Sequence, residues 1–506
     1  MSKKIIVAGA GHGGMVAAYY LAKDGYDVTV YEKQKRNMLG YPQYDSVHLD
    51  GFEESGIPIP EQYRKKRTPI TFCIPGSGIE PVTQGDAGNT YNVEIDRKFL
   101  YRYLIGMAEE AGAKFVFGCE ISSAIILGNR IAGIKTSKGD IYGDLVIDAA
   151  GLYSPVRSSL PEFTHIQSEP GRNEVLNTYR AYFSRVKNAP EPEHKYLVSL
   201  IPGEFCGLMW VVTKEDCVDV LIGSFNRLQE EDVNKYLGLL REDNPHIGKR
   251  LVKGGKIYDI PLRQPLAVLV ADGYAAVGDS AFMTIPIKGS GIGYSMRAGK
   301  ILAQTVAADE NGFYTAETLW NYQTQFFDSI GSTSALLAVI KCLFPKITFE
   351  DLEYIFGEKV VTSEDLEMFG NESSVMQIIS SLDLGALKDK ALKAVGHQNI
   401  RKILLSTGKN IAVYKLVEQG LKKSWSPAAA AKWADGYNSF FEELTDDTSE
   451  QDAEKELKQT QKLEKKKEKE QEKELKKVRK KEKEQIKKSK ETEKDPSEND
   501  TEDETV

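Results

Sequence analysis

The N-terminal part of the chain carries closely spaced residues that could bind a phosphate group. An apolar run, Lys4–Ala8, is typical of a buried strand, and four glycines follow it: Gly9, Gly11, Gly13 and Gly14. Gly9 suits a tight turn, Gly11 lets the backbone approach a pyrophosphate, and Gly14 lets a helix pack closely on the strand. The phosphates would lie at the N-terminus of a helix over Met15–Lys23, where N–H groups and the helix dipole favour negative charge.

A second expected strand, Val28–Tyr31, ends at a carboxylate, Glu32. This acid lies about twenty residues past the glycines, where the ribose hydroxyl of a dinucleotide needs an acceptor. Glycine spacing alone is weak evidence, because a plain glycine-rich turn has the same composition. The succession of strand, glycines, helix, strand and acid predicts a dinucleotide-binding unit.

The composition of the 506 residues is that of a globular protein, with 41% hydrophobic residues and a formal net charge of −8. The five cysteines form no CxxC pair, which favours free thiols in a reducing compartment, and the six histidines have no metal-ligand spacing. We therefore expect a cytoplasmic protein without a metal or a nucleic-acid partner. The longest apolar segment, Ala335–Phe344, is too short to span a bilayer, and His12 is interpreted as a turn residue.

Helix and strand patterns alternate after the glycine motif. The stretch Gln34–Tyr63 is expected to be irregular, whereas amphipathic spacing predicts a helix from Asp96 to Gly112. Short strands are expected within Lys114–Ala150. Residues Asn177–Phe225 alternate as strands without intervening helices, which predicts a second sheet in a separate, substrate-facing domain.

A second glycine-rich region follows further along the chain. Ala275–Val277 is expected to be a short buried strand, Asp279 follows it, and the loop Pro286–Gly293 leads into a helix. A helix cap without a ligand is the alternative for Asp279, but its place after a buried strand and before two glycines favours a cofactor role. Residues beyond Phe326 are expected to be helical and irregular, and the Lys- and Glu-rich C-terminal tail cannot bury a core.

Three regions are expected to converge on one cofactor: the glycine motif with Glu32, the segment Asp148–Arg157, and Gly278–Asp279 with its loop. A flavin needs the third region, which a simple NAD dehydrogenase does not. Over roughly residues 1–330 the chain resembles the flavoprotein superfamily of p-hydroxybenzoate hydroxylase and geranylgeranyl reductase. The resemblance implies an α/β fold with a glutathione-reductase-type, Rossmann-like FAD-binding domain, an inserted antiparallel β-sheet substrate domain, a C-terminal helical region and a charged, disordered tail.

The resemblance also implies roles for individual residues. The glycines of the first motif would bind the FAD pyrophosphate, and Glu32 the adenosine ribose. The remaining implied cofactor contacts are Arg97, the backbone at Ile121, Asp279, Gly289, Gly291 and Ile292. Trp210 and Lys288 would line the substrate pocket, although a buried sheet tryptophan and a solvated loop lysine are the alternatives. No residue is assigned as catalytic, because the flavin performs the redox chemistry.

Two departures from the hydroxylase pattern favour the reductase branch. Ala150 stands where hydroxylases of this type usually carry aspartate, which argues against direct docking of NAD(P)H, and Ile292 and Gly293 follow the flavin glycines where hydroxylases tend to carry asparagine. We therefore expect an FAD-dependent, geranylgeranyl-reductase-like oxidoreductase that transfers a hydride at a C–C bond of an apolar or lipid-like substrate. Its electrons would come from another protein or a reduced carrier. The alternatives are an FAD-dependent monooxygenase and a non-catalytic scaffold whose charged tail recruits partners.

The expected domain boundaries follow from these patterns. The FAD-binding domain would comprise residues 1–67, 93–165 and 265–330, and the substrate domain residues 68–92 and 166–264. A helical C-terminal region would span residues 331–445 and the tail residues 446–506. The Lys-rich part of the tail is expected to contact an anionic membrane surface weakly, which would place the protein peripherally at a membrane.

Overall fold

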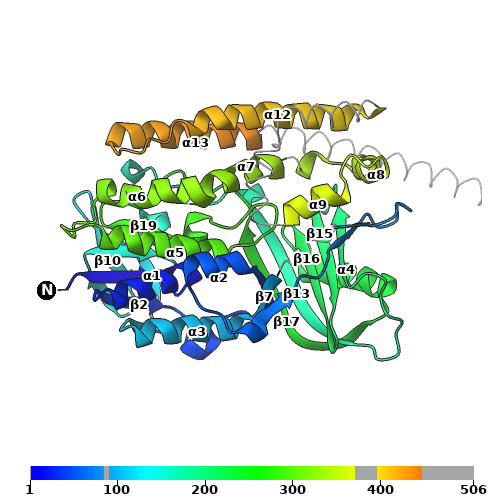
Figure 1. The fold of residues 1–506 in the computed structure, drawn as a ribbon, viewed down its shortest axis with the longest axis horizontal. Coiled ribbons are helices and arrows are strands. Elements are labelled where there is room, and N and C mark those ends of the chain that lie inside the picture. The colour runs from blue at the N-terminus through cyan, green and yellow to red at the C-terminus, as the bar shows by residue number, and fades with distance from the viewer. Residues whose placement is uncertain (1, 85–90, 168, 343, 371–395, 447–506) are drawn as a thin grey trace, which may run out of the picture. The chain divides into compact units, whose positions relative to one another are not determined.

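The computed structural model of the chain describes residues 2–84, 91–167, 169–342, 344–370 and 396–446 (Figure 1). Residues Met1–Thr445 form one compact unit. The domain boundaries expected within this unit stay predictions. The expected charged tail lies outside the described residues.

A six-stranded sheet carries the glycine motif. Its order is β18-β19-β12-β1-β2-β8, and all neighbours run parallel except β18 and β19. The strands are β1 (Lys4–Ala8), β2 (Asp27–Glu32), β8 (Lys114–Phe117), β12 (Leu145–Asp148), β18 (Val270–Ala271) and β19 (Tyr274–Ala276). Beyond Lys4, every residue of β1 is buried, as expected for an apolar parallel strand.

Helices α1 (His12–Lys23) and α5 (Ile292–Ala307) pack against each other beside this sheet (Figure 1). The contact requires glycines. A Cβ atom on Gly299 would lie 2.2 Å from the carbonyl oxygen of Gly13, and one on Gly13 would lie 2.6 Å from that of Ser295. Because Gly13 and Ser295 belong to the first turns of their helices, the two helix N-termini lie side by side.

The expectation that Gln34–Tyr63 is irregular is wrong. The segment contains a short helix, α2 (Leu49–Ser55), and one strand, β3 (Tyr44–His48), which forms a small antiparallel sheet with β7 (Tyr91–Asp96) and β4 (Arg64–Lys66) further along the chain. Helix α2 crosses α5 where a Cβ on Gly51 would lie 2.6 Å from the Cα atom of Gly293. With only about two turns, α2 is too short to give a clear apolar period, so the sequence does not predict it.

The remaining elements of this region follow the sequence pattern. The expected strands after Lys114 include a hairpin sheet made of β9 (Ile121–Leu127), β10 (Arg130–Thr136) and β11 (Gly139–Tyr142). Helix α3 (Arg97–Glu110) begins after Asp96, whose Oδ1 accepts hydrogen bonds from the backbone N–H groups of Lys98 and Phe99. The helix predicted from Asp96 is therefore confirmed, with that residue as its cap.

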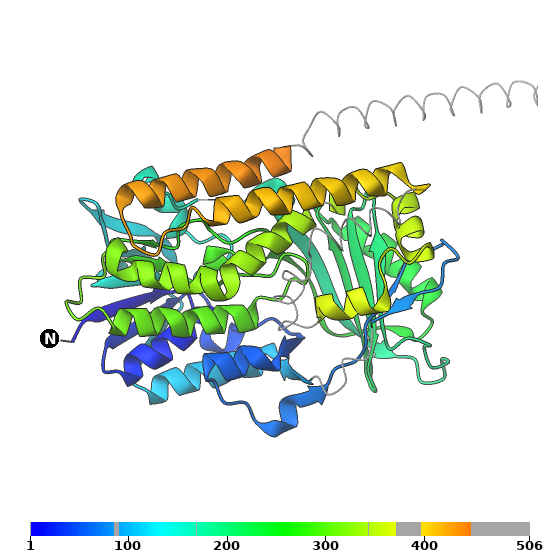
Figure 2. The same ribbon diagram turned by 45° about the horizontal axis from the view of Figure 1, so that its top comes forward.

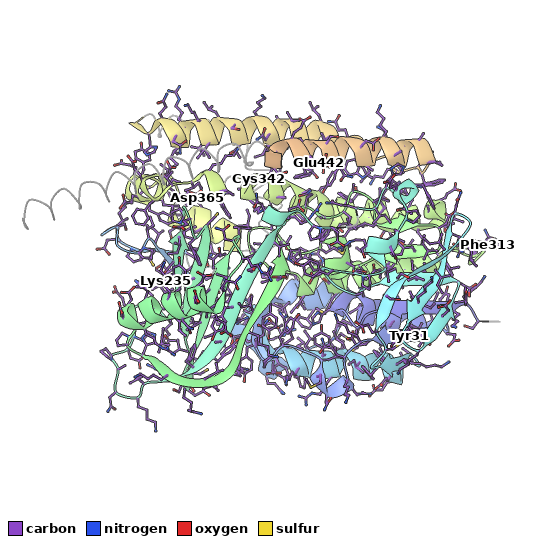
Figure 3. All side chains as sticks on the ribbon, turned by 180° about the vertical axis from the view of Figure 1, so that it is seen from behind. Tyr31, Lys235, Phe313, Cys342, Asp365 and Glu442 are labelled. Carbon is purple, nitrogen blue, oxygen red and sulfur yellow. The ribbon has the colours of Figure 1, made fainter. Side chains whose placement is uncertain are left out.

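A seven-stranded sheet follows, of order β17-β13-β16-β15-β14-β5-β6, and its strands are antiparallel except for the pair β14 and β5 (Figures 2 and 3). The strands are β5 (Thr71–Cys73), β6 (Val82–Thr83), β13 (Val175–Arg185), β14 (Tyr196–Ile201), β15 (Gly207–Thr213), β16 (Cys217–Ser224) and β17 (Ile247–Pro261). Helix α4 (Glu230–Asp243) packs on it through Val233, Leu237 and Leu240. The predicted second sheet is therefore present.

Helix α6 (Ala316–Phe326), a π-helical turn (Phe327–Gly331) and α7 (Ser332–Lys341) form one helical run. The segment Ala316–Lys346, whose 31 residues include this run, is long and apolar enough to cross a membrane by length and composition alone. The expectation that no segment is long enough is therefore wrong, because the π-turn continues the helix past Phe326. Since 71% of its most apolar window is buried inside the protein, the run has the burial of a core helix.

Helices α8 (Phe349–Gly357) and α9 (Ser363–Gly370) come next in the chain, and α12 (Gln398–Glu418) and α13 (Pro427–Asp446) lie outermost, beyond α6 and α7 (Figures 1 and 2). Helix α13 is fixed to the core by two polar contacts. Trp433 Nε1 donates to the carbonyl oxygen of Ala267 at 2.7 Å, and the Tyr437 hydroxyl donates to that of Pro265 at 3.1 Å.

Candidate functional site

Helices α1 and α5 both begin on a glycine without a side-chain cap. Their N-cap residues are Gly11 and Gly291, and neither first turn contains an acidic residue. By contrast, the side chains of Asp96, Thr315 and Thr348 cap α3, α6 and α8. Uncapped N–H groups and the helix dipole attract anions, so two adjacent helix N-termini of this kind can hold two negatively charged parts of one ligand.

Close backbone contacts explain the glycines of the first motif. Gly9 has a φ of +88°, and a Cβ at Gly9 or Gly11 would lie 2.5 or 2.7 Å from the carbonyl oxygen of Ala149. A Cβ on Gly14 would lie 2.9 Å from Cγ1 of Val7 in β1. The turn at Gly9 and the helix–strand packing at Gly14 agree with the sequence prediction. Gly11 must be a glycine for an additional reason, because the carbonyl oxygen of Ala149, just past the end of β12, fills the space beside it.

Glu32 lies at the end of β2, beside the glycine motif. Its Oε2 accepts a hydrogen bond from the N–H of Ala10 at 2.9 Å, and its Oε1 accepts one from that of Gln34 at 2.8 Å. Each carboxylate oxygen can accept a second hydrogen bond, so Glu32 keeps capacity for a ribose hydroxyl. The carbonyl oxygen of Glu32 also accepts from the N–H of Cys119 at 2.9 Å, which brings Ile121, the first residue of β9, to the same end of the sheet.

Asp279 lies in a short turn after β19, at the N-terminus of α5. Thr284 Oγ1 donates to its Oδ1 at 3.0 Å, and a Cβ on Gly291 would lie 3.6 Å from the same oxygen. Burial raises the pKa of Asp279, against the opposite effects of that hydrogen bond and of Arg97 and Arg157. The ionised carboxylate therefore lowers the stability of the folded protein, and a destabilising group kept at an uncapped helix terminus is expected to bind a ligand.

The loop before α5 has the predicted form. Gly289 adopts a φ of +66°, Gly291 is the N-cap and Ile292 is the first helical residue. Lys288, half-buried in this loop, precedes Gly289, whose added Cβ would lie 3.8 Å from Ile260 of β17. Trp210 lies on β15, and β13 and β16 separate that strand from β17. The structure therefore places Trp210 on the sheet and Lys288 in a loop beside a different strand, β17.

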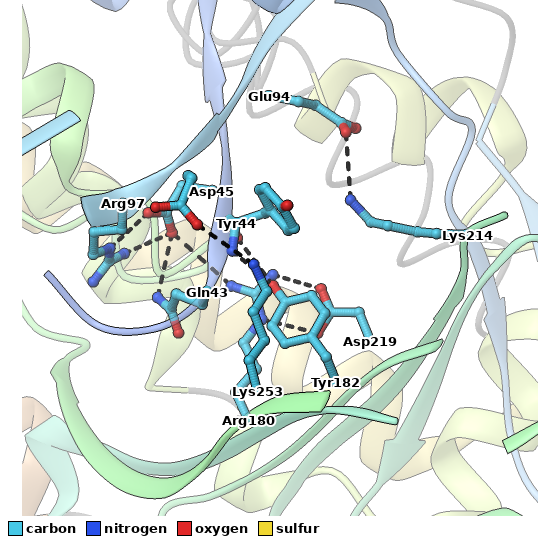
Figure 4. A network of polar contacts seen from close by, with 11 residues as sticks. Gln43, Tyr44, Asp45, Glu94, Arg97, Arg180, Tyr182, Lys214, Asp219 and Lys253 are labelled. Atoms are coloured by element: carbon cyan, nitrogen blue, oxygen red, sulfur yellow. Dashed lines mark hydrogen bonds and ion pairs between the residues drawn. The ribbon is translucent and has the colours of Figure 1, made fainter. Parts of the chain in front are cut away.

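A chain of charged side chains connects Arg97 with the seven-stranded sheet (Figure 4). Arg97 donates from Nε and Nη2 to the two carboxylate oxygens of Asp45, each at 2.6 Å. On the other side, Oδ1 of Asp45 lies 3.9 Å from Nη1 of Arg180. Arg180 in turn donates to Asp219 at 3.0 and 2.6 Å. The guanidinium predicted to contact the cofactor is thus oriented by a carboxylate that also faces the second sheet.

Opposite charges keep this chain ionised. Burial alone would raise the pKa of Asp45, but Arg97 and Arg180 hold it below its usual value. Burial likewise disfavours the charged form of Arg180, yet Asp219 and Asp45 raise its pKa above the ordinary arginine value. The Arg180 guanidinium lies 5.2 Å from the ring centroid of Trp210. Trp210 is therefore connected to Arg97 through two charged residues, Arg180 and Asp45.

His12 begins α1 in the middle of the glycine motif. Its ring centroid lies 4.7 Å from that of Tyr101, and its Nε2 atom is buried without a hydrogen-bond partner. Burial, helped by the charge of Arg97, lowers the pKa of His12 to about 3, so its imidazole is neutral at neutral pH. A neutral, unpartnered ring nitrogen at this helix terminus offers a hydrogen bond to a ligand, a possibility that the interpretation as a turn residue missed.

A pocket lies between the small sheet of β3, β4 and β7 and the seven-stranded sheet. Most of the residues that line it have polar or charged side chains, among them Asp45, Glu94, Arg180, Lys214 and Asp219. The charges are paired with each other, because Lys214 lies 3.4 Å from Glu94 and Arg180 binds Asp219. Trp210 is not among the lining residues, although its ring centroid lies 5.2 Å from the guanidinium of the lining residue Arg180. Among the described residues, no group of three or more His, Cys, Asp or Glu side chains could hold a metal ion.

Four residues of this site were not identified from the sequence: Ala149, Asp45, Arg180 and Asp219. One signal was available, because Arg180 interrupts an apolar strand pattern and a buried charge needs a partner. The partners themselves come from distant segments, so the spacing along the chain does not reveal them.

Three comparisons with known proteins agree with this geometry. Residues 7–43, which contain the glycine motif, match the family described as the NAD(P)-binding Rossmann-like domain. The chain is 24% identical over 450 residues to the digeranylgeranylglycerophospholipid reductase of Sulfolobus acidocaldarius, covering 85% of this chain and 95% of the relative. It is 25% identical over 405 residues to the protein of the same name from Methanoculleus marisnigri, covering 76% and 98%.

Solved structures share the fold. A geranylgeranyl bacteriochlorophyll reductase-like protein from Thermoplasma acidophilum matches with a TM-score of 0.62 and 19% identity, covering 77% of this chain and 98% of that chain. PqsL of Pseudomonas aeruginosa, described as a probable FAD-dependent monooxygenase, matches with a TM-score of 0.51 and 16% identity, covering 71% and 100%. The predicted α/β fold is thereby confirmed. These similarities support the resemblance of the chain to the flavoprotein superfamily of p-hydroxybenzoate hydroxylase and geranylgeranyl reductase.

Proposed function

We propose that this protein is an FAD-dependent reductase that adds a hydride and a proton across a carbon–carbon double bond of an apolar, isoprenoid-like substrate. The observation that carries the proposal is the pair of uncapped helix N-termini, α1 and α5, with Glu32 and Asp279 beside them. The curated relatives, which are named as reductases of a digeranylgeranyl lipid, support the reaction type and the substrate class.

The residues present fit FAD part by part. The first-turn N–H groups of α1 would hold the pyrophosphate, and Glu32 would accept a hydrogen bond from the adenosine ribose. Asp279 would accept one from the ribityl chain or orient the pyrophosphate. The first-turn N–H groups of α5 would stabilise negative charge at the N1–C2=O edge of the reduced ring. When bound, the flavin supplies the hydride and is oxidised, so each turnover needs an electron pair from a donor.

The residue at position 150 bears on the source of those electrons. The N–H of Ala150 donates to Asp148 Oδ1 at 3.1 Å, so the backbone is held in place, but its methyl group cannot replace the carboxylate that hydroxylases usually carry there. This change removes a polar contact on the expected nicotinamide side. We infer that a reduced protein or small carrier, and not NAD(P)H directly, supplies the electron pair.

Flavin identification followed by reduction kinetics tests this proposal. The purified protein should be yellow and should release FAD on denaturation, as identified by mass spectrometry. Under anaerobic conditions, dithionite should reduce the flavin quickly, whereas NADH and NADPH should reduce it slowly. Added isoprenoid lipid should then reoxidise it. A protein that never binds flavin would contradict the cofactor, and rapid NADPH oxidation coupled to hydroxylation of a substrate would contradict the reductase.

A further inference from the structure

The outward face of α12 combines exposed apolar side chains with cationic ones. Leu405, Val413 and Leu416 are 53%, 38% and 68% exposed. Leu405 and Leu416 lie on one line of the helix, about three turns apart. The exposed cations of the same helix are Arg401, Lys402, Lys409 and Lys415.

This face is not the one by which α12 packs on the protein. The buried residues of the helix, among them Ile400, Ile403, Ile411 and Tyr414, lie on the opposite side. Ile400 and Ile403 form a cluster with Tyr354 of α8. The exposed leucines therefore contribute nothing to the core, and leaving them in water has an energetic cost.

The neighbouring helix α13 provides an internal comparison. Its exposed residues include Lys432, Asp435, Ser439, Glu442 and Glu443, and none of its large apolar side chains is among the exposed ones in the described residues. Helix α12 instead carries four cations and a single acid, Glu418, although the whole chain has a formal charge of −8. Apolar exposure and positive charge thus coincide on one of two adjacent outer helices.

We propose that the outward face of α12 is a docking surface for an anionic lipid bilayer, with its leucines entering the headgroup region and its cations facing the lipid phosphates. Protruding leucines between lysines match a lipid surface, which accepts both groups, whereas a nucleic-acid backbone would pair with the charges alone. The surface would hold the protein beside apolar lipid. Its test does not depend on turnover, so it can fail independently of the proposed reaction.

Co-sedimentation with vesicles tests the proposal on the full chain. The wild type should sediment with phosphatidylcholine vesicles that contain phosphatidylglycerol, and only weakly with pure phosphatidylcholine. The paired substitutions Leu405→Ser with Leu416→Ser, and separately Lys402→Glu with Lys409→Glu, should each lower the partition coefficient about tenfold or more. All four positions are exposed, so thermal midpoints should be unchanged.

Two matched variants serve as controls. Leu127→Ser removes an equally exposed leucine, 58% exposed on β9, and Lys432→Glu reverses a charge on α13. Both should bind like the wild type. Failure of the wild type to bind anionic vesicles would overturn the proposal. Equal binding by the α12 variants would also overturn it, and would assign any binding to another part of the chain, such as the Lys-rich tail.

Discussion

The two large sheets hold their functional residues by different means. Beside the six-stranded sheet, α1 and α5 present backbone N–H groups, and they reach one another because Gly13 and Gly299 lack side chains. At the seven-stranded sheet, Arg180 is fixed by charged side chains, Asp219 and Asp45. An added side-chain atom at Gly13 or Gly299 would push the two helices apart, whereas a lost charge at the second sheet would leave a buried charge without its partner. The two regions should therefore fail under opposite kinds of substitution.

The largest effect is expected from Asp45→Ala. The substitution leaves Arg97 without its bidentate partner. It also removes the carboxylate that lies between the guanidinium groups of Arg97 and Arg180. The loss should cost about 3–5 kcal/mol of unfolding free energy. The matched control is Asp27→Ala, which removes an exposed pair with Lys114 and should cost about 0–1 kcal/mol. Urea unfolding at neutral pH, followed by circular dichroism, measures both.

The effect of Asp45→Ala on the unfolding free energy should depend on pH in a definite direction. Because the folded state holds the pKa of Asp45 below its unfolded value, the carboxylate stabilises the protein above about pH 4, and this stabilisation is lost as the pH falls through the lower, folded value. The difference in unfolding free energy between the wild type and Asp45→Ala should thus be largest near neutral pH and should become smaller in acid. A gap that widens in acid would contradict the ion-pair account.

A smaller effect is expected from adding one methyl group between α1 and α5. Gly299→Ala would place a Cβ 2.2 Å from the carbonyl oxygen of Gly13, so the helices must separate, at a cost of about 1–3 kcal/mol. In Gly106→Ala, the matched change in α3, the new Cβ meets no atom within 4 Å and should stabilise the protein by about 0.5–1 kcal/mol. Thermal midpoints that move in the same direction would undermine the close-contact argument.

The same contrast explains what could be predicted from the sequence. The glycine motif, Glu32 and Asp279 can be predicted as candidate site residues because backbone geometry dictates both residue type and local spacing. Their roles in cofactor binding stay predictions. The strands of both sheets follow from apolar runs and alternation. Asp45 and Ala149 were missed because their roles depend on segments far away in the chain, and α2 was missed because it is short. Gly11 was only partly understood, since Ala149 also requires it to be a glycine.

The smallest expected change in stability has an unusual sign. Asp279→Asn should weaken FAD binding by about 1.5 kcal/mol, roughly tenfold, because it removes a charged hydrogen-bond acceptor. The same change should stabilise the flavin-free protein. Burial raises the pKa of Asp279, so its ionised form destabilises the folded state as the pH rises above about 4, and asparagine removes that penalty.

The control for this prediction is Asp309→Asn, beyond the C-terminus of α5. Asp309 accepts hydrogen bonds from the N–H groups of Gly312 and Tyr314, so its substitution should lower stability and leave FAD affinity unchanged. Fluorescence titration of the flavin-free proteins with FAD and their melting curves give both quantities. If Asp279→Asn bound FAD as tightly as the wild type, Asp279 would be a structural residue only.

The proposed reaction itself is tested most directly by the mass of its product. An isoprenoid lipid should be incubated anaerobically with the dithionite-reduced, FAD-loaded enzyme and analysed by mass spectrometry. The lipid should gain two hydrogen atoms for each double bond reduced, in step with reoxidation of the flavin. A lipid of unchanged mass beside fully reduced enzyme, or a product that gains oxygen when NADPH and air are supplied, would contradict the assignment as a reductase.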